Sequence, residues 1–213
     1  METMKTGTTT VGIVCRDGVV IGADQQATMG SIASIKNIKK VFQITDNIAM
    51  TIAGTAGDGQ ALAKMIKAEL NLYKMQNNIE GFVPVKVAAN LLGTILRSGY
   101  KNSPRPDMVQ LLIAGYDDEN GAQVFDTDIT GGVYPIDDFS FSGSGSYMAL
   151  GVLEDAYKKG CSVEEGVNVF VRALKSARKR DVYTGGDSLT IATITKDGLI
   201  WLPKEKVNEL LKD

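Results

Sequence analysis

The sequence contains no histidine in its 213 residues. This absence excludes a Ser-His-Asp or Cys-His catalytic arrangement, and it excludes a metal site with histidine ligands. If the chain is a hydrolase, its general base has to come from another group. Cysteine is also scarce, since Cys15 and Cys161 are the only two and lack the spacing of metal ligands. Such usage is typical of a reduced, cytoplasmic chain with two inert thiols.

Long apolar runs are absent as well. No stretch approaches the roughly 18 residues that a membrane-spanning helix needs, and residues 1–7 lack the apolar core of a secretory signal. The formal net charge of −2 gives no reason to expect a nucleic acid or a membrane surface as partner. The basic run at residues 175–180 is explained by a charged, solvated helix face. No linker rich in Pro, Gly or Ser divides the chain, so one domain is expected.

Apolar runs of β type alternate along the chain with apolar residues at helical spacing. Strands are predicted over residues 9–15, 19–24, 38–44, 48–54, 108–115, 122–129, 132–141, 188–195 and 199–202. Helices are predicted after residues 57–59, from Pro84, over residues 146–159 and 163–181, and after Pro203. Ser162 and Glu165 have the spacing of a capping box for the helix over 163–181.

The order of these elements suggests an architecture. Strands are followed by a helix pair, more strands, a second helix pair and closing strands. Two mostly antiparallel sheets have to bury one face against each other, and each helix pair has to cover an outer face. The sequence therefore predicts an α+β fold, a four-layer α-β-β-α sandwich.

The start of the first predicted strand has a possible chemical role. Gly7 precedes Thr8, Thr9 and Thr10, and cleavage after Gly7 would leave a hydroxyl and a free α-amine together on Thr8. An α-amine titrates at about 7.7–8.0, so part of it is free base at neutral pH and could activate that hydroxyl. The alternative is that these threonines only form a strand, because β-branched side chains suit a pleated surface.

Lys39 and Lys40 lie within an otherwise apolar run, and Asp24 ends the second predicted strand. Strand alternation directs one lysine inward if the other faces solvent. A buried lysine needs a carboxylate partner, and Asp24 is a candidate. The alternative is a solvated edge strand that carries both lysines.

Two glycine-hydroxyl clusters lie at junctions between elements. One spans residues 143–146, where backbone amides at a helix start could bind an oxyanion, and the other spans residues 180–186. Glycine at a helix end is often only a turn device. Neither the Walker A pattern nor the dinucleotide-binding glycine pattern is present, which argues against a phosphate loop.

Taken together, these segments resemble the catalytic β-subunits of the 20S proteasome, which are N-terminal nucleophile hydrolases, and the archaeal forms most of all. The resemblance covers nearly the whole chain and depends on the order and spacing of its parts. The matching segments are residues 8–12, Asp24, residues 39–40, 50–54, 108–112, 143–146, 151–154 and 180–181. The four-layer sandwich is also the fold that this family implies.

The resemblance implies roles for individual residues. Thr8 matches the nucleophile, exposed when residues 1–7 are removed by self-cleavage of the Gly7–Thr8 bond, which leaves residues 8–213 as one peptidase domain. The backbone N–H of Gly54 matches the oxyanion donor, and Thr28 matches the segment that pairs with extended substrate. The remaining catalytic matches are Asp24, Lys40, Ser144, Asp181 and Thr184. Two positions depart from the usual pattern: Gln26 replaces a basic residue, and Thr184 replaces the commoner serine.

The resemblance also implies a specificity pocket. Its lining residues would be Ala27, Ile38, Phe42, Ile52 and Ala56. All five are apolar, so cleavage after hydrophobic residues is expected.

No cofactor or metal is implied. The expected partners are other β-subunits and α-subunit rings in stacked heptameric rings, with unfolded polypeptides delivered by a regulatory ATPase. Two alternatives remain: a subunit of the related bacterial two-ring ATP-dependent protease, whose chains are shorter, or a non-catalytic, structural ring subunit.

Overall fold

The computed structural model describes residues 7–29, 32–104 and 107–212. The expected leader lies outside these residues except for Gly7. The first half of the chain forms β1 (Thr9–Cys15), β2 (Gly18–Asp24), β3 (Ala27–Met29), β4 (Ile32–Ile35), β5 (Val41–Thr45), β6 (Ile48–Gly54), α1 (Ala56–Gln76) and α2 (Val85–Asn102). The second half forms β7 (Val109–Asp117), β8 (Gly121–Thr127), β9 (Val133–Ile136), β10 (Phe139–Gly143), α3 (Ser146–Ala156), α4 (Val163–Arg180), β11 (Leu189–Thr195), β12 (Gly198–Trp201) and α5 (Lys204–Lys212).

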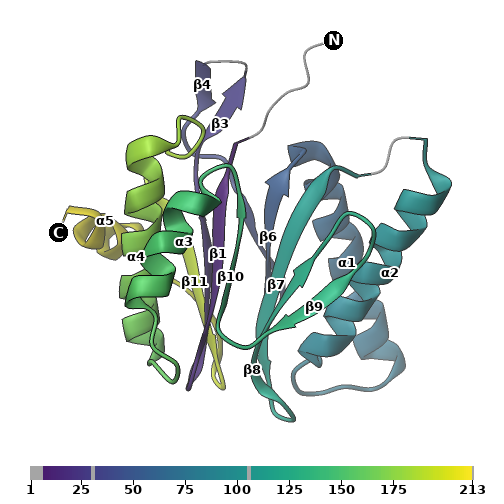
Figure 1. Ribbon diagram of the computed structural model, residues 1–213. Helices are drawn as coiled ribbons and strands as arrows, with labels where there is room; N and C mark the ends of the chain where they lie inside the picture. The colour runs from purple at the N-terminus through teal and green to yellow at the C-terminus, as the bar shows by residue number, and fades with distance from the viewer. Residues whose placement is uncertain (1–6, 30–31, 105–106, 213) are drawn as a thin grey trace.

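Two five-stranded antiparallel sheets form the centre of the molecule. One has the strand order β10-β1-β2-β11-β12 and the other β5-β6-β7-β8-β9. Figure 1 shows α3 and α4 outside the first sheet and α1 and α2 outside the second. The predicted four-layer α-β-β-α sandwich is therefore confirmed.

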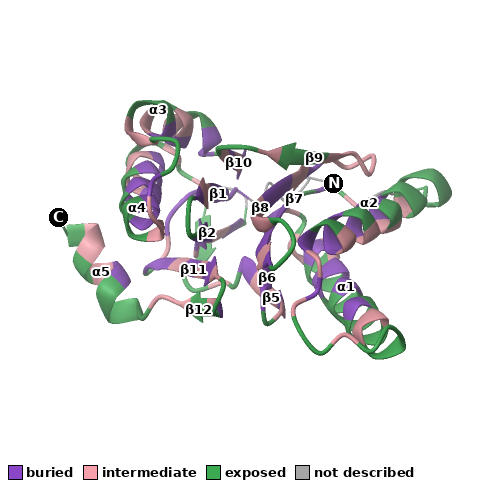
Figure 2. Ribbon diagram, turned by 90° about the horizontal axis from the view of Figure 1, so that it is seen from below, coloured by how far each residue is buried: buried purple, intermediate pink, exposed green. Residues whose placement is uncertain are grey.

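Each interface between layers has its own apolar cluster. Between the two sheets, Val19 and Ile21 meet Leu112. The strands of the first sheet pack on α3 and α4, and those of the second pack on α1 and α2. Figure 2 shows the buried residues on the strands and on the helix faces that meet them. Because β1 and β2 are covered on both faces, they read in sequence as nearly continuous apolar runs.

The run predicted as one strand over residues 132–141 is two strands in different sheets. β9 pairs with β8 at the edge of the second sheet, and β10 pairs with β1 in the first. Pro135 lies in β9, and proline is tolerated on this edge strand because no further strand needs a hydrogen bond from its missing N–H. Residues 137–138 carry the chain across, and this crossover brings the end of β10 beside the start of β1.

The strand predicted from residue 38 begins only at Val41. The Ile38 N–H donates to the Gln25 carbonyl at 3.0 Å, and the Lys40 carbonyl accepts from the Ile52 N–H at 2.9 Å. Residues 38–40 therefore bridge the end of β2 and β6 outside the regular ladder. The small β3–β4 hairpin just before them was not predicted from the sequence. Among the described residues, no helix is long and apolar enough to cross a membrane.

Candidate active site

Thr8 lies immediately before β1 and is buried, with 3% of its surface exposed. Its hydroxyl donates to the Gly7 carbonyl oxygen at 2.7 Å. Its backbone N–H donates to Ser144 Oγ at 3.2 Å. The β1–β10 register sets Thr9 opposite Gly143, which is why Ser144 reaches the residue before the strand.

Asp24 ends β2 directly beside this point, because the β1–β2 register pairs Thr10 with Ala23. Its carboxylate is fully buried and accepts four hydrogen bonds. One comes from Lys40 Nζ at 2.7 Å. The other donors are the backbone amides of Thr9, Gln26 and Gly185, each at 3.0 Å. A buried carboxylate with this many donors is held rigidly.

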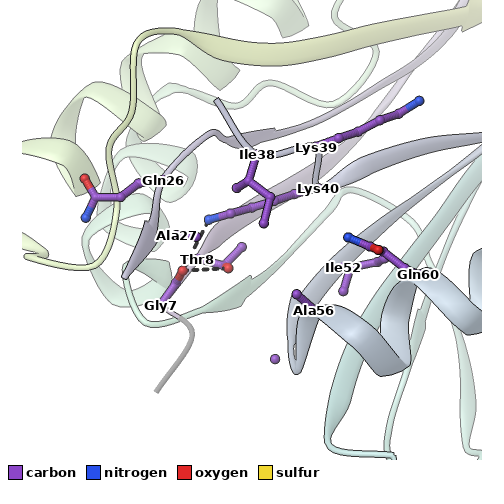
Figure 3. Close-up of a pocket in the computed structure, with 11 residues that line it drawn as sticks. Gly7, Thr8, Gln26, Ala27, Ile38, Lys39, Lys40, Ile52, Ala56 and Gln60 are labelled. Carbon is purple, nitrogen blue, oxygen red and sulfur yellow. Dashed lines mark hydrogen bonds between the residues drawn. The ribbon is translucent and has the colours of Figure 1, made fainter. Parts of the chain in front are cut away.

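Lys40 is buried, whereas its neighbour Lys39 is exposed. The predicted partnership of Lys40 with Asp24 is confirmed. Lys40 Nζ also donates to the Gly7 carbonyl oxygen at 3.2 Å. Figure 3 shows its nitrogen directed at Gly7 and Thr8, while Lys39 extends away from the pocket. Burial lowers the pKa of Lys40 below its usual 10.5, and the Asp24 carboxylate offsets part of this effect.

Ser144, Asp181 and Thr184 form one hydrogen-bonded group beside Thr8. Ser144 Oγ donates to Asp181 Oδ2 at 2.6 Å, and Thr184 Oγ1 donates to the same oxygen at 2.5 Å. Thr184 Oγ1 also lies 2.6 Å from Thr9 Oγ1. Asp181 follows the last residue of α4, so the helix end and the β10–α3 junction meet here. The threonine at position 184 thus makes its contacts through its hydroxyl.

A pocket opens next to Thr8 (Figure 3). Four of the five residues expected in the specificity pocket line it: Ala27, Ile38, Ile52 and Ala56. The lining residues that sequence reasoning missed are Gln26, Lys39 and Gln60. Gln60 lies one helical turn after Ala56 on α1, and this spacing could have placed it on the same face.

Phe42 and Thr28 do not line this pocket. Phe42 packs against the cluster beneath α1 and α2, with Lys39 Nζ at 5.3 Å from its ring centre. Thr28 is buried in β3, and its hydroxyl accepts a hydrogen bond from Gln26 Nε2 at 3.0 Å. Gln26 Nε2 also donates to the Val182 carbonyl at 2.9 Å. Gln26 therefore connects β3 with the loop after α4.

Gly54 ends β6 at the pocket wall. Its φ is +114°, a conformation that favours glycine. A Cβ atom here would lie 2.2 Å from the Met108 carbonyl oxygen, so no other residue fits without rearrangement. No group of three or more Cys, Asp or Glu side chains in the described part of the chain is arranged to hold a metal ion.

The two-sheet sandwich is the fold of the N-terminal nucleophile hydrolases. In this chain a threonine enters the first strand beside a buried lysine–aspartate pair. The chain belongs to the proteasome family: the family model described as "Proteasome subunit" matches residues 4–194. It is a subunit of a proteasome core and assembles with other proteasome subunits.

Relatives from archaea match nearly the full length of this chain. "Proteasome subunit beta" of Methanobrevibacter smithii is 44% identical over 205 residues, which is 96% of this chain and 95% of the relative. "Proteasome subunit beta" of Methanocaldococcus jannaschii is 42% identical over 99% of this chain and 91% of its own length. "Proteasome subunit beta 2" of Thermococcus onnurineus is 46% identical over 93% of this chain and 96% of its own length.

Proposed function

We propose that this chain is a threonine endopeptidase with Thr8 as its N-terminal nucleophile. The observation that carries the proposal is a shared target: Thr8 Oγ1 and Lys40 Nζ both contact the carbonyl oxygen of Gly7. A hydroxyl and a cation on one buried carbonyl are the parts that an acyl transfer needs.

Self-cleavage comes first. Thr8 Oγ attacks the Gly7 carbonyl carbon, and the Lys40 ammonium stabilises the negative charge that develops on the oxygen. The C–N bond breaks, the hydroxyl proton passes to the departing nitrogen, and an ester joins Gly7 to Thr8 Oγ. Water hydrolyses this ester, which releases residues 1–7 with a carboxylate at Gly7 and leaves the Thr8 amine exposed. Residues 8–213 are then the mature peptidase domain.

Peptide hydrolysis then uses the same groups. The Thr8 amine accepts the hydroxyl proton, and Oγ attacks the carbonyl carbon of the scissile bond. That C–N bond breaks, the leaving amine takes the proton and departs, and water hydrolyses the acyl-enzyme with the Thr8 amine as base. Asp24 keeps Lys40 charged and oriented through the 2.7 Å contact. The Ser144–Asp181–Thr184 group holds the Thr8 nitrogen. The Gly54 backbone N–H is assigned to the oxyanion; losing one such donor typically costs about 100-fold or more in rate.

Substrate selection follows from the pocket walls. Ala27, Ile38, Ile52 and Ala56 present apolar surface, which favours cleavage after hydrophobic residues. Thr28 in β3 is assigned to backbone pairing with an extended substrate, a mode that needs unfolded polypeptide. The partners proposed for this role are α-subunit rings and a regulatory ATPase that delivers substrate to stacked heptameric rings in the cytoplasm.

A peptidase assay on the assembled particle tests the proposal. Thr8→Ala removes the nucleophile and is expected to abolish cleavage of fluorogenic peptides. Thr8→Ser keeps a hydroxyl and is expected to retain activity. Thr10→Ser, two residues further along the chain in β1, is the matched control and is expected to match wild type. A Thr8→Ala particle that cleaves peptides as fast as wild type would refute the assignment.

A further inference from the structure

Gly7 is buried and packs against Tyr183 so tightly that it has no room for a side chain. A Cβ atom on residue 7 would lie 1.6 Å from Tyr183 Cβ, 2.5 Å from its Cγ and 2.9 Å from its Cα. Because the Cα and Cβ atoms are involved, rotating the tyrosine ring does not relieve the overlap. The backbone at residue 183 or at residue 7 would have to move.

That backbone is anchored from several sides. The Tyr183 N–H donates to Asp181 Oδ1 at 3.2 Å, and the Val182 carbonyl accepts from Gln26 Nε2 at 2.9 Å. The Gly185 N–H donates to the buried carboxylate of Asp24 at 3.0 Å. A shift of residue 183 therefore disturbs contacts to both Asp24 and Asp181.

The same Asp181 carboxylate is linked through Ser144 to the nitrogen of the Gly7–Thr8 bond. Asp181 Oδ2 accepts from Ser144 Oγ at 2.6 Å, and Ser144 Oγ accepts from the Thr8 N–H at 3.2 Å. The loop over residues 181–185 thus confines the acyl side of this bond through Tyr183 and holds its amide side through Asp181. Displacing one end of the loop displaces the other.

We infer that Tyr183 is a positioning residue for self-cleavage, and that the 181–185 loop is a steric gauge that accepts only glycine before Thr8. The gauge keeps the Gly7 carbonyl against Thr8 Oγ1 and Lys40 Nζ. The Tyr183 contact therefore adds a requirement for space at residue 7 to the role of Gly7 as the residue before the cut. The Gly7–Tyr183 contact exists only before residues 1–7 are removed, so the loop acts on the precursor and not on peptide substrates. This inference rests on the proposed self-cleavage.

A rescue experiment tests the gauge. Gly7→Ala is expected to slow cleavage of the 7–8 bond by about 100-fold, the typical cost of a misplaced reacting group. Gly7→Ala combined with Tyr183→Gly removes the overlapping Cβ and is expected to recover about tenfold or more, a coupling typical of residues in contact. Gly7→Ala with Tyr183→Phe keeps that Cβ and is expected to stay as slow as Gly7→Ala alone. Cleavage is followed by intact mass during assembly.

The control is a glycine at the neighbouring exposed position, Gly7→Ala with Val182→Gly, because Val182 is 76% exposed. This control is expected not to rescue. Equal rescue by Val182→Gly would show that loop flexibility is responsible and would overturn the inference, as would a Gly7→Ala precursor that is cleaved at the wild-type rate. If Thr8→Ala is itself cleaved between residues 7 and 8, the proposed function fails instead.

A crystal structure covers the case in which Tyr183→Gly disrupts the fold. In a non-cleavable Thr8→Ala precursor, the distance from Ser144 Oγ to the residue 8 nitrogen is expected to stay near the 3.2 Å seen with Gly7. With Gly7→Ala added, it is expected to lengthen beyond hydrogen-bonding range. An unchanged distance in the double variant would contradict the gauge.

Discussion

Lys40 and Asp24 form a buried ion pair, with 2.7 Å between Nζ and Oδ1 and no more than 7% of either side chain exposed. The two residues come from different segments, the connection before β5 and the end of β2. Their contact therefore joins the two sheets at the point where Thr8 enters the first strand.

Removing either member of this pair should destabilise the chain to different extents. Asp24→Ala leaves a buried ammonium and three backbone amides without their acceptor, and we expect a loss of about 3–5 kcal/mol. Lys40→Met leaves the carboxylate with those three amides, so its loss should be smaller. Urea unfolding of the free precursor chains measures both. A larger loss for Lys40→Met would contradict this ordering.

The lowered pKa of Lys40 predicts the alkaline limit of peptidase activity. Activity should rise as the mature Thr8 amine becomes free base, at about pH 8. It should fall again below pH 10.5, because burial makes Lys40 lose its charge before an ordinary lysine does. Lys40→Arg keeps its charge to above about pH 12, so its alkaline limb should disappear. An identical limb in wild type and Lys40→Arg would exclude Lys40 as its source.

The pocket predicts the order of substrates. Peptides with Leu or Tyr before the scissile bond should be cleaved faster than those with Arg or Glu. The walls are mainly apolar, and of the two lysines that line the pocket, Lys39 extends away and Lys40 points at Gly7 and Thr8. Ile38→Ala enlarges the pocket and should raise the Tyr:Ala ratio of kcat/KM by about tenfold. Faster cleavage after Arg or Glu by wild type would contradict the assignment of this pocket.

Cys15 and Cys161 should resist alkylation in the folded chain. Both are buried, their sulfur atoms lie 3.8 Å apart, and burial raises the pKa of each thiol. Since the thiolate is the reactive form, iodoacetamide at neutral pH should label neither residue until a denaturant is added. Rapid labelling of the native protein, followed by mass spectrometry, would show that one thiol is accessible.

Several features of the site could be predicted from the sequence. The pairing of Lys40 with Asp24 could be predicted from the local sequence, because a lysine inside an apolar run needs a carboxylate partner. The sandwich could also be predicted, because strands that are covered on both faces appear in the sequence as apolar runs. Local pattern also predicted β1 and β6 with the bounds that the structure has.

Other features depend on contacts between distant segments. Nothing local separates β9 from β10, because both are β-type sequence and only their pairing partners differ. Phe42 is apolar, as a residue of the specificity pocket would be, yet its register in β5 directs it to the core beneath α1. The overlap of Gly7 with Tyr183 joins residues 176 positions apart, a separation that no periodicity reveals.

Intact mass of the assembled chain tests the central claim most directly. The chain is produced with α-subunits as wild type and as Thr8→Ala, and both are weighed after assembly. We expect wild type to begin at Thr8, having lost residues 1–7, and Thr8→Ala to keep them. A wild-type chain that keeps an intact Gly7–Thr8 bond in assembled particles would contradict the account and indicate a structural ring subunit.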